Sequence, residues 1–295
     1  MTTLTRNHGP MLHPRITVLV RRNGAVQLGW DPSTAVILQP PGPAEAMPAF
    51  LRLLDGMRTQ PEILWQARAL GFDGEATQSL LDEMASAGLL AHDEPRSRLR
   101  TVRVHGRGPL SDALAEGLRR IGLRPSRSSE RDTAEPRDGI PEFARPDRPE
   151  LVVLADALVP DPALVAEFME YGVPHLQVRM RDGRGVVGPL VLPGETSCLR
   201  CADLHRCDRD PDWPHLSAQL LGRVGYASTA GIAAATALAL QEVETIAHGS
   251  AEHPPATLNT TLELDLDSPH IDHRPWPVHP NCGCLQGENS ENEWV

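Results

Sequence analysis

Three short apolar runs with turn residues between them open the chain. The runs cover 16–20, 25–30 and 34–38, and Asn23 and Gly24 lie between the first two. An Asn-Gly pair between apolar runs is typical of a hairpin with a type I′ turn, in which both turn residues have positive φ. The pattern therefore predicts three short antiparallel strands.

A change to helical spacing follows the predicted strands. Apolar residues recur every three or four positions in three segments, which are 44–54, 60–70 and 75–87. Gly88 ends the third segment, and 89–91 has the pattern of a returning strand. Strands, three helices and a returning strand predict a winged-helix-like module over 14–97, preceded by a tail at 1–13.

The third predicted helix has an acidic polar face. Asp73, Glu75, Asp82 and Glu83 lie in it or beside it, and it has no arginine. A DNA-binding helix needs cations to contact phosphates, so we expect no nucleic acid here. A peptide that adds a strand to the sheet edge fits better. A packing module without a ligand is the alternative that composition leaves open.

A second pattern, of alternating strands and helices, starts near residue 100. A strand at 101–105 is followed by Gly106, Gly108 and Ser111, and then by a helix at 112–121. This order opens doubly wound nucleotide-binding folds, in which glycines let the backbone approach a phosphate at the helix N-terminus. A tight turn without a nucleotide is the alternative, because Ser111 replaces the third glycine.

The same α/β pattern continues towards the C-terminus. Further elements are predicted as strands at 151–154, 174–179 and 186–192 and a helix at 162–171. Asp182-Gly183 predicts a hairpin turn, whereas the polar segment 124–149 predicts a surface loop or a linker-like insertion. We therefore expect a doubly wound, Rossmann-like domain over 98–285 and a tail at 286–295.

Four of the five cysteines form two close pairs. Cys198 and Cys201 are separated by about 80 residues from Cys282 and Cys284. Two such pairs can complete a tetrahedral four-sulfur zinc site, whose closed shell gives it a structural role. Reduced thiols or disulfides are the alternatives. Cys207 lies in an Arg/Asp-rich segment that predicts a loop, and we interpret it as a bystander thiol.

Charge and hydropathy exclude several classes of protein. The net charge is −11, which argues against general binding to nucleic acid or anionic membranes, and all 28 basic residues are arginine. The apolar stretch 229–240 is too short to span a bilayer, although its small residues could pack helix against helix in a homodimer. Residues 1–14 have no signal-peptide pattern, so we expect a cytoplasmic protein.

Several segments resemble ThiF/MoeB/HesA-type activating proteins. Segments 189–201 and 279–284 resemble the family's two zinc-binding cysteine pairs with their flanks. Segment 225–246 resembles its Ala-rich helix near the dimer interface, and 258–266 resembles the strand before the last cysteines. The resemblance covers about 100–285 and implies a ThiF-type domain.

Members of this family bind ATP and adenylate the C-terminal carboxylate of a carrier protein. The resemblance implies that Gly106 and Gly108 surround the nucleotide and that Asp156 holds magnesium. A helix cap is the alternative role for Asp156. The chain departs from the family in its missing third glycine and in having no lysine to contact a phosphate.

A winged-helix-like module followed by a degenerate activating-type domain resembles the cyclodehydratase-partner proteins of thiazole/oxazole-modified peptide biosynthesis. Segment 203–214 also resembles their actinobacterial subgroup. This resemblance implies that the edge strand 34–38 and helix 75–87 bind the leader of a precursor peptide. A separate YcaO-type partner would then use ATP, and this chain would have no catalytic residue. An ATP-dependent adenylyltransferase that activates a peptide or carrier C-terminus is the alternative.

Overall fold

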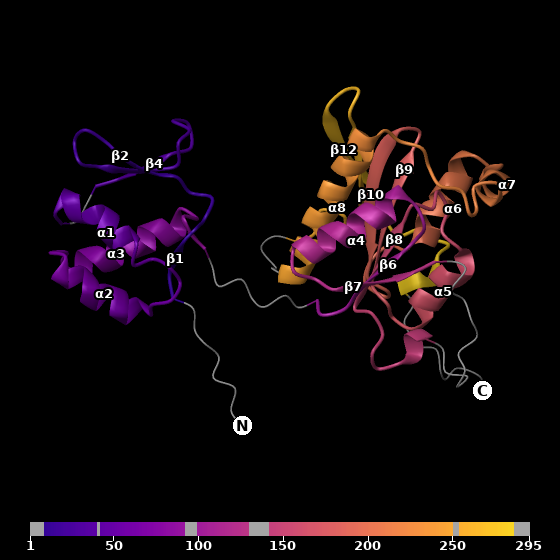
Figure 1. Cartoon of the computed structure of the whole chain (residues 1–295). Coiled ribbons are helices and arrows are strands. Elements are labelled where there is room, and N and C mark those ends of the chain that lie inside the picture. Colours follow the sequence, from indigo (N-terminus) through magenta and orange to yellow (C-terminus); the bar gives the residue numbers. More distant parts are fainter. Residues whose placement is uncertain (1–8, 40–41, 92–98, 130–141, 250–253, 286–295) are drawn as a thin grey trace. The chain divides into compact units, whose positions relative to one another are not determined.

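The chain divides into two compact units, Met1–Pro95 and Arg96–Val295 (Figure 1). The structure is a computed structural model that describes residues 9–39, 42–91, 99–129, 142–249 and 254–285. Each unit has its own hydrophobic core. The boundary at 97/98 predicted from the sequence stays a prediction.

A three-stranded antiparallel sheet forms one part of the first unit. Its strands, in spatial order, are β2 (Val18–Val20), β3 (Val26–Leu28) and β4 (Val36–Leu38). The predicted hairpin is confirmed, but its turn type is wrong. Gly24 has a φ of 82°, whereas Asn23 is not among the residues with positive φ. The N–H of Gly24 donates to the Arg21 carbonyl (3.0 Å), as in a three-residue loop that ends on a left-handed glycine.

The rest of the first unit is a helical layer with a second, two-stranded sheet. The elements are η1 (Ala44–Ala46), α1 (Met47–Leu51), α2 (Gln60–Ala69), α3 (Gly74–Ser86), and β1 (Met11–Leu12) paired with β5 (Leu90–Ala91). Residues 11–12, expected in a tail, are therefore part of a sheet. Asp73 caps α3 by accepting the N–H groups of Glu75 and Ala76, both at 3.0 Å.

A mixed sheet of seven strands forms the centre of the second unit, as far as the structure describes it. The strands are β6 (Val102–His105), β7 (Pro125–Ser128), β8 (Leu151–Ala155), β9 (His175–Arg181), β10 (Arg184–Val191), β11 (Thr260–Asp265) and β12 (His270–Pro275). The order is β12-β11-β10-β9-β8-β6-β7. The pairs from β7 to β9 are parallel, and those from β9 to β12 are antiparallel. Asp182 and Gly183 both have positive φ, so the predicted hairpin turn between β9 and β10 is confirmed.

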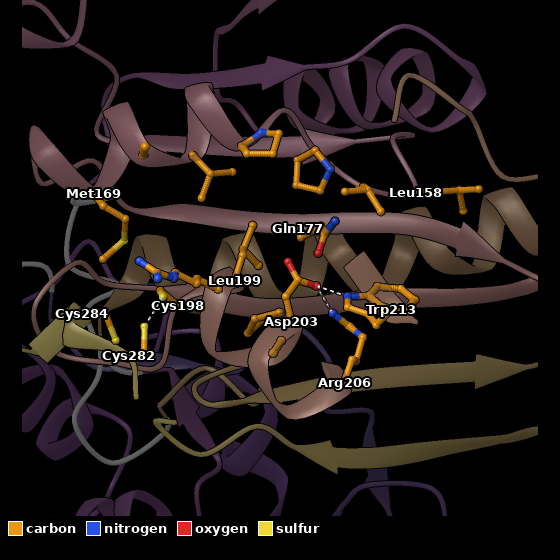
Figure 2. A pocket seen from close by; sticks show the side chains of 18 of the residues that line it. Leu158, Met169, Gln177, Cys198, Leu199, Asp203, Arg206, Trp213, Cys282 and Cys284 are labelled. Carbon is orange, nitrogen blue, oxygen red and sulfur yellow. Dashed lines mark hydrogen bonds and ion pairs between the residues drawn. The ribbon is translucent and has the colours of Figure 1, made fainter. Parts of the chain in front are cut away.

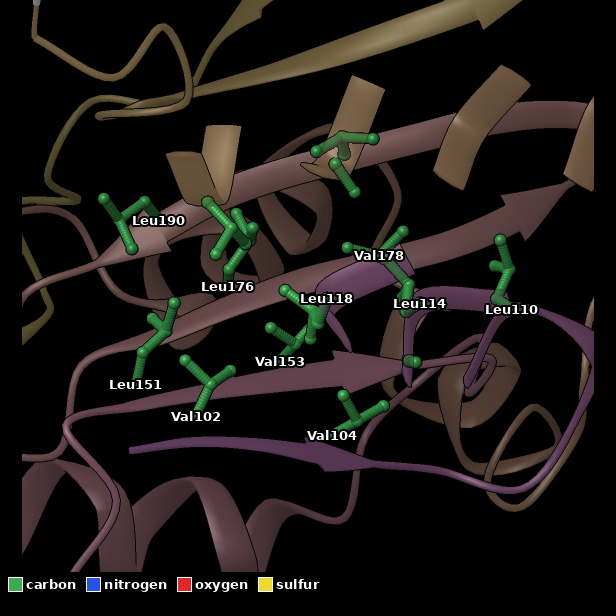
Figure 3. Packing of buried hydrophobic residues seen from close by; sticks show 14 of the residues in the cluster. Val102, Val104, Leu110, Leu114, Leu118, Leu151, Val153, Leu176, Val178 and Leu190 are labelled. Atoms are coloured by element: carbon green, nitrogen blue, oxygen red, sulfur yellow. The ribbon is translucent and has the colours of Figure 1, made fainter. Parts of the chain in front are cut away.

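Helices cover both faces of this sheet. On β8, Leu151 and Val153 join one core with α4 (Pro109–Arg120) and α8 (Thr229–His248) (Figure 3). Val152 and Leu154 join the other core with α5 (Pro162–Glu170) and α6 (Leu199–Arg209). Because side chains alternate along a strand, a strand that is buried on both faces has a continuous apolar sequence. The short helix α7 (Trp213–Ala218) follows α6.

Segment 124–149 is more ordered than the sequence predicts. Its start forms β7, which pairs in parallel with β6, and Phe143 is buried against Phe168 with ring centroids 4.9 Å apart. Residues 130–141 lie outside the described part of the chain. An edge strand is held by backbone hydrogen bonds and needs no apolar alternation. The polar sequence of β7 therefore did not predict a strand.

The small-residue stretch 229–240 belongs to α8 and packs inside the unit. Ala235 and Ala239 are fully buried in the core that α8 shares with α4. A homodimer through this stretch therefore stays a prediction. Among the residues that the structure describes, no helix combines the length and hydropathy that a membrane span requires.

Thermal stability is expected to fall between pH 6.5 and 4 because of His175 on β9. Burial lowers the pKa of its imidazole to about 4, while Nδ1 contacts the Val173 carbonyl at 2.9 Å. The unfolded chain therefore binds more protons in this window, so the stabilisation present above pH 6.5 is lost as the pH falls towards 4. The shift corresponds to about 3 kcal/mol. Thermal unfolding from pH 7 to 4 measures it, and His175→Gln should flatten the profile relative to the exposed control His215→Gln.

Candidate functional site

The two cysteine pairs meet at the α5/α6 face of the sheet. Cys198 caps the start of α6, Cys201 lies in its first turn, and Cys282 and Cys284 come from the C-terminal segment. The Sγ atoms of Cys198 and Cys282 are 3.6 Å apart, those of Cys201 and Cys284 are 3.4 Å apart, and all four lie within 4.8 Å of one another. All four thiols are free. The cluster could hold a metal ion, because tetrahedral Zn–S bonds of about 2.3 Å place sulfurs roughly 3.8 Å apart.

Burial and hydrogen bonding act differently on three of the four thiols, which are Cys198, Cys201 and Cys284. Burial raises the pKa of Cys198, and it raises that of Cys284 to about 11. Burial also acts on Cys201, but hydrogen bonds from the backbone of His279 and Cys198 outweigh it and lower the pKa of that thiol. The thiolate of Cys201 is therefore favoured by its surroundings, whereas Cys198 and Cys284 need a cation beside them to lose their protons. This donor set fits a closed structural metal site.

A hydrogen-bonded brace holds the second cysteine pair. The Nδ1 of His279 accepts the N–H of Asn281 (3.1 Å), so its Nε2 carries the proton and donates to Asp208 on α6 (2.9 Å). The carbonyl of His279 accepts the N–H of Cys282 (2.9 Å). His205, also on α6, contacts the Pro277 carbonyl through Nε2 (3.0 Å). His205, Asp208 and His279 also lie close enough together to hold a metal ion. In this structure their hydrogen bonds attach the C-terminal segment to α6.

Cys207 lies on a helix, not in the predicted loop. The helix α6 continues to Arg209, and Cys207 is half-buried outside the four-sulfur cluster. Leu199 and Ala202 anchor the start of α6 in the core, so the helix continues through a polar sequence that has no apolar period of its own.

Gly106, Gly108 and Asp156 lie together at the N-terminus of α4. The carboxylate of Asp156 accepts the N–H of Leu110 (2.9 Å) and the N–H of Ser111 (3.1 Å), and Asp156 is 2% exposed. A Cβ at Gly108 would lie 2.6 Å from the Asp156 Oδ1 atom. The side chain thus lies where a phosphate would bind to a helix N-terminus. Nucleotide binding by these residues stays a prediction.

Comparison with known proteins identifies the fold. No family model matches the chain, and no curated protein matches it significantly. Solved structures do match. A heterocyclase in complex with substrate and cofactor superposes with a TM-score of 0.63 at 17% identity, over 94% of this chain and 39% of its own. The heterocyclase TruD superposes with a TM-score of 0.62 at 17% identity, over 94% of this chain and 42% of TruD. E. coli MccB with MccA-N7isoASN superposes with a TM-score of 0.59 at 11% identity, over 94% of this chain and 99% of MccB.

The chain has the fold of TruD and MccB. The resemblance to ThiF/MoeB-type proteins is thereby confirmed at the level of the fold. The chain spans less than half the length of the heterocyclases and nearly all of MccB.

Within this TruD/MccB fold, a cavity of about 630 Å³ adjoins the cysteine cluster (Figure 2). Gln177 and Arg179 of β9 line it, and sequence analysis missed both. A signal was present, because polar residues alternate with Leu176 and Val178 in the predicted strand 174–179. Polar residues on one face of a central strand indicate a site rather than a core.

Proposed function

We propose that this protein is a leader-peptide-binding scaffold in the modification of ribosomally made peptides of the thiazole/oxazole type. The first unit binds the leader of a precursor peptide as an added strand on β4. The second unit presents the rest of the precursor to a YcaO-type cyclodehydratase in the cytoplasm. The observation that carries this proposal is that β4 lies at a free edge of its sheet, because among the strands that the structure describes it pairs only with β3.

The hydrogen-bonding direction of β4 favours strand addition. The N–H of Gly29 donates to the Thr17 carbonyl across the β2–β3 pair (2.8 Å), so the odd-numbered residues of β3 bond to β2. Because this direction alternates along an antiparallel strand, the even-numbered residues of β3 bond to Val36 and Leu38 of β4. Ile37 therefore directs its N–H and C=O to the free edge, and its side chain is 47% exposed. A peptide strand would find both a donor and an acceptor there.

Ile37→Pro is expected to weaken leader binding at least tenfold, or about 1.4 kcal/mol. Proline removes the N–H that faces the free edge and leaves the β3–β4 bonds in place. The probe is the fluorescein-labelled leader peptide of a candidate precursor, titrated by fluorescence anisotropy into the full chain.

Val18→Pro is the matched control for this titration. Val18 lies on β2, the opposite edge of the same sheet, and its N–H also faces outwards by the same alternation. Its substitution should leave leader binding unchanged. Equal losses in both variants would reject β4 as the leader site.

The solved structures support the assignment of a peptide substrate and a partner enzyme. The matched proteins include a heterocyclase with substrate and the microcin C7 biosynthetic enzyme MccB with N-formylated MccA. This chain covers 39–42% of the length of the two heterocyclase chains. The proposal therefore assigns the ATP-consuming step to the YcaO-type partner.

An ATP-dependent adenylyltransferase is the second candidate. It is favoured by the match to MccB, one structure of which contains ATP. It is disfavoured by the Asp156 carboxylate, which takes two N–H groups at the start of α4 that a nucleotide phosphate would need. The absence of lysine from the sequence also removes the family's phosphate-contacting cation.

The cysteine cluster is proposed to hold one structural zinc ion. Four sulfur donors and tetrahedral spacing support zinc, and a closed shell leaves no position for a reacting water. The ion would join α6 to the C-terminal segment and so complete the wall of the cavity that Cys198, Cys282 and Cys284 line.

A further inference from the structure

The cavity beside the cysteine cluster has a strongly cationic lining. Its ionisable residues other than cysteine are Arg179, Arg181, Arg200, Arg206 and Asp203. With four guanidinium groups and one carboxylate, the lining has an excess of positive charge, whereas the net charge of the chain is −11. The same lining also contains apolar side chains, which include Leu158, Val165 and Met169.

Arg179 is the cation in this lining that is both buried and unpaired. It is 6% exposed and has no ion pair or hydrogen bond with any residue that the structure describes. Burial lowers the pKa of its guanidinium to about 9, and repulsion from Arg206 and Arg181 adds to the effect. A buried charge without a partner is costly, and in native proteins such charges are paired or bind a ligand.

The neighbouring acids are already engaged by other groups. Figure 2 shows Asp203 bonded through Oδ1 to Arg206 (2.8 Å) and to the Nε1 of Trp213 (3.1 Å). Arg181 pairs with Glu263 at 2.6 Å. Arg179 therefore lines the cavity without an ion pair or hydrogen bond in the described part of the chain, although the carboxylates of Asp203 and Glu263 attract it from a longer distance.

Gln177 supplies a second unused donor on the same face of β9. It lies two positions before Arg179, is 3% exposed, and lines the cavity. Its Nε2 is fully buried and has no hydrogen-bond partner among the described residues. Native structures rarely leave such a group unsatisfied without a functional reason.

We propose that this cavity binds a carboxylate carried on an apolar group. A guanidinium fork and an adjacent amide donor match the planar acceptor geometry of a carboxylate. The apolar side chains of Leu158, Val165 and Met169 accommodate the apolar body. A small organic acid and a peptide carboxylate share this chemistry. The site does not depend on leader binding by the first unit.

Isothermal titration of the full chain tests the site. Hexanoate should bind, and both hexanamide with wild type and hexanoate with Arg179→Gln should bind at least tenfold more weakly. Arg184→Gln is the matched control, because Arg184 pairs with Asp265 (2.8 Å) and is not in the cavity lining. It should bind hexanoate like wild type.

Two further probes distinguish the sources of the carboxylate. An apolar hexapeptide with a free C-terminus that binds more tightly than hexanoate, while its amidated form does not, would identify a peptide carboxylate. Preference for hexanoate over both peptides would identify a small acid. The proposal would be overturned if neither hexanoate nor the free-acid peptide binds. It would also be overturned if inorganic phosphate binds more tightly than hexanoate, or if Arg179→Gln binds hexanoate like wild type.

The stability of the ligand-free protein gives an independent readout. Arg179→Met removes an unpaired buried cation but keeps an unbranched apolar side chain, so Tm should rise by about 2–4 °C. Hexanoate should raise the Tm of wild type and not that of Arg179→Met. A lower Tm in ligand-free Arg179→Met would mean that the fold needs the guanidinium, and would overturn the assignment.

Discussion

Cys198→Ser is expected to lose the bound metal ion and to unfold at a clearly lower temperature than wild type. Cys198 and Cys282 are 84 positions apart, so an ion that both ligate closes a long loop. A cross-link of that span stabilises a fold by about 4–5 kcal/mol in the chain-entropy account. The variant also leaves the buried Cys201 and Cys282 and the half-buried Cys284 with no bound cation between them.

Elemental analysis and thermal unfolding measure the two effects. Wild type should carry one zinc ion per chain, and a chelator should lower its Tm towards that of Cys198→Ser. Cys207→Ser is the matched control, since Cys207 lies on the same helix outside the cluster, and it should keep both the ion and the Tm. An ion retained by Cys198→Ser would contradict the ligand set.

Asp156→Ala is expected to destabilise the second unit by about 3 kcal/mol or more. The change removes the acceptor of two buried N–H groups, and each such unsatisfied group costs about 1–3 kcal/mol. It also places alanine at a φ of 70°, a left-handed conformation that an L side chain other than Asn or Asp rarely adopts. Denaturant unfolding measures the loss.

Two control variants separate these contributions. Asp156→Gly relieves the backbone strain but not the unpaired N–H groups, so it should lose less stability than alanine. Asp156→Asn tolerates the left-handed φ and keeps one acceptor oxygen, so it should lose the least. Equal stability of all three variants and wild type would show that Asp156 does not hold α4.

The same variants decide between scaffold and adenylyltransferase. A scaffold should show no exchange of labelled pyrophosphate into ATP, with or without the precursor peptide. Exchange by wild type that disappears in Asp156→Asn, a variant expected to stay folded, would favour the adenylating enzyme. That result would place the nucleotide next to Asp156 despite its hydrogen bonds to α4.

The strongly patterned elements could be predicted from the sequence. The continuous apolar run 151–154 and the helical spacing at 112–121 correspond to β8 and α4, because burial on two faces or on one stripe leaves a direct trace in the sequence. The cysteine pairs were recognisable for a similar reason, since two thiolates a few positions apart can bind one ion. By contrast, the polar edge strand β7 and helix α6 have no apolar periodicity from which they could be predicted.

The residue pattern alone was enough to predict the α/β class of the second unit, the three strands and three helices of the first, and the residues of the four-sulfur cluster. The folded structure was needed to see that Asp156 caps α4 and that Arg179 and Gln177 line a cavity, where the Arg179 guanidinium and the Gln177 Nε2 have no hydrogen-bond partner among the described residues. The reason is physical. Periodicity indicates which residues are buried. A hydrogen bond between residues 110 and 156, or a buried guanidinium without an ion pair in the described part of the chain, depends instead on which distant segments fold next to each other.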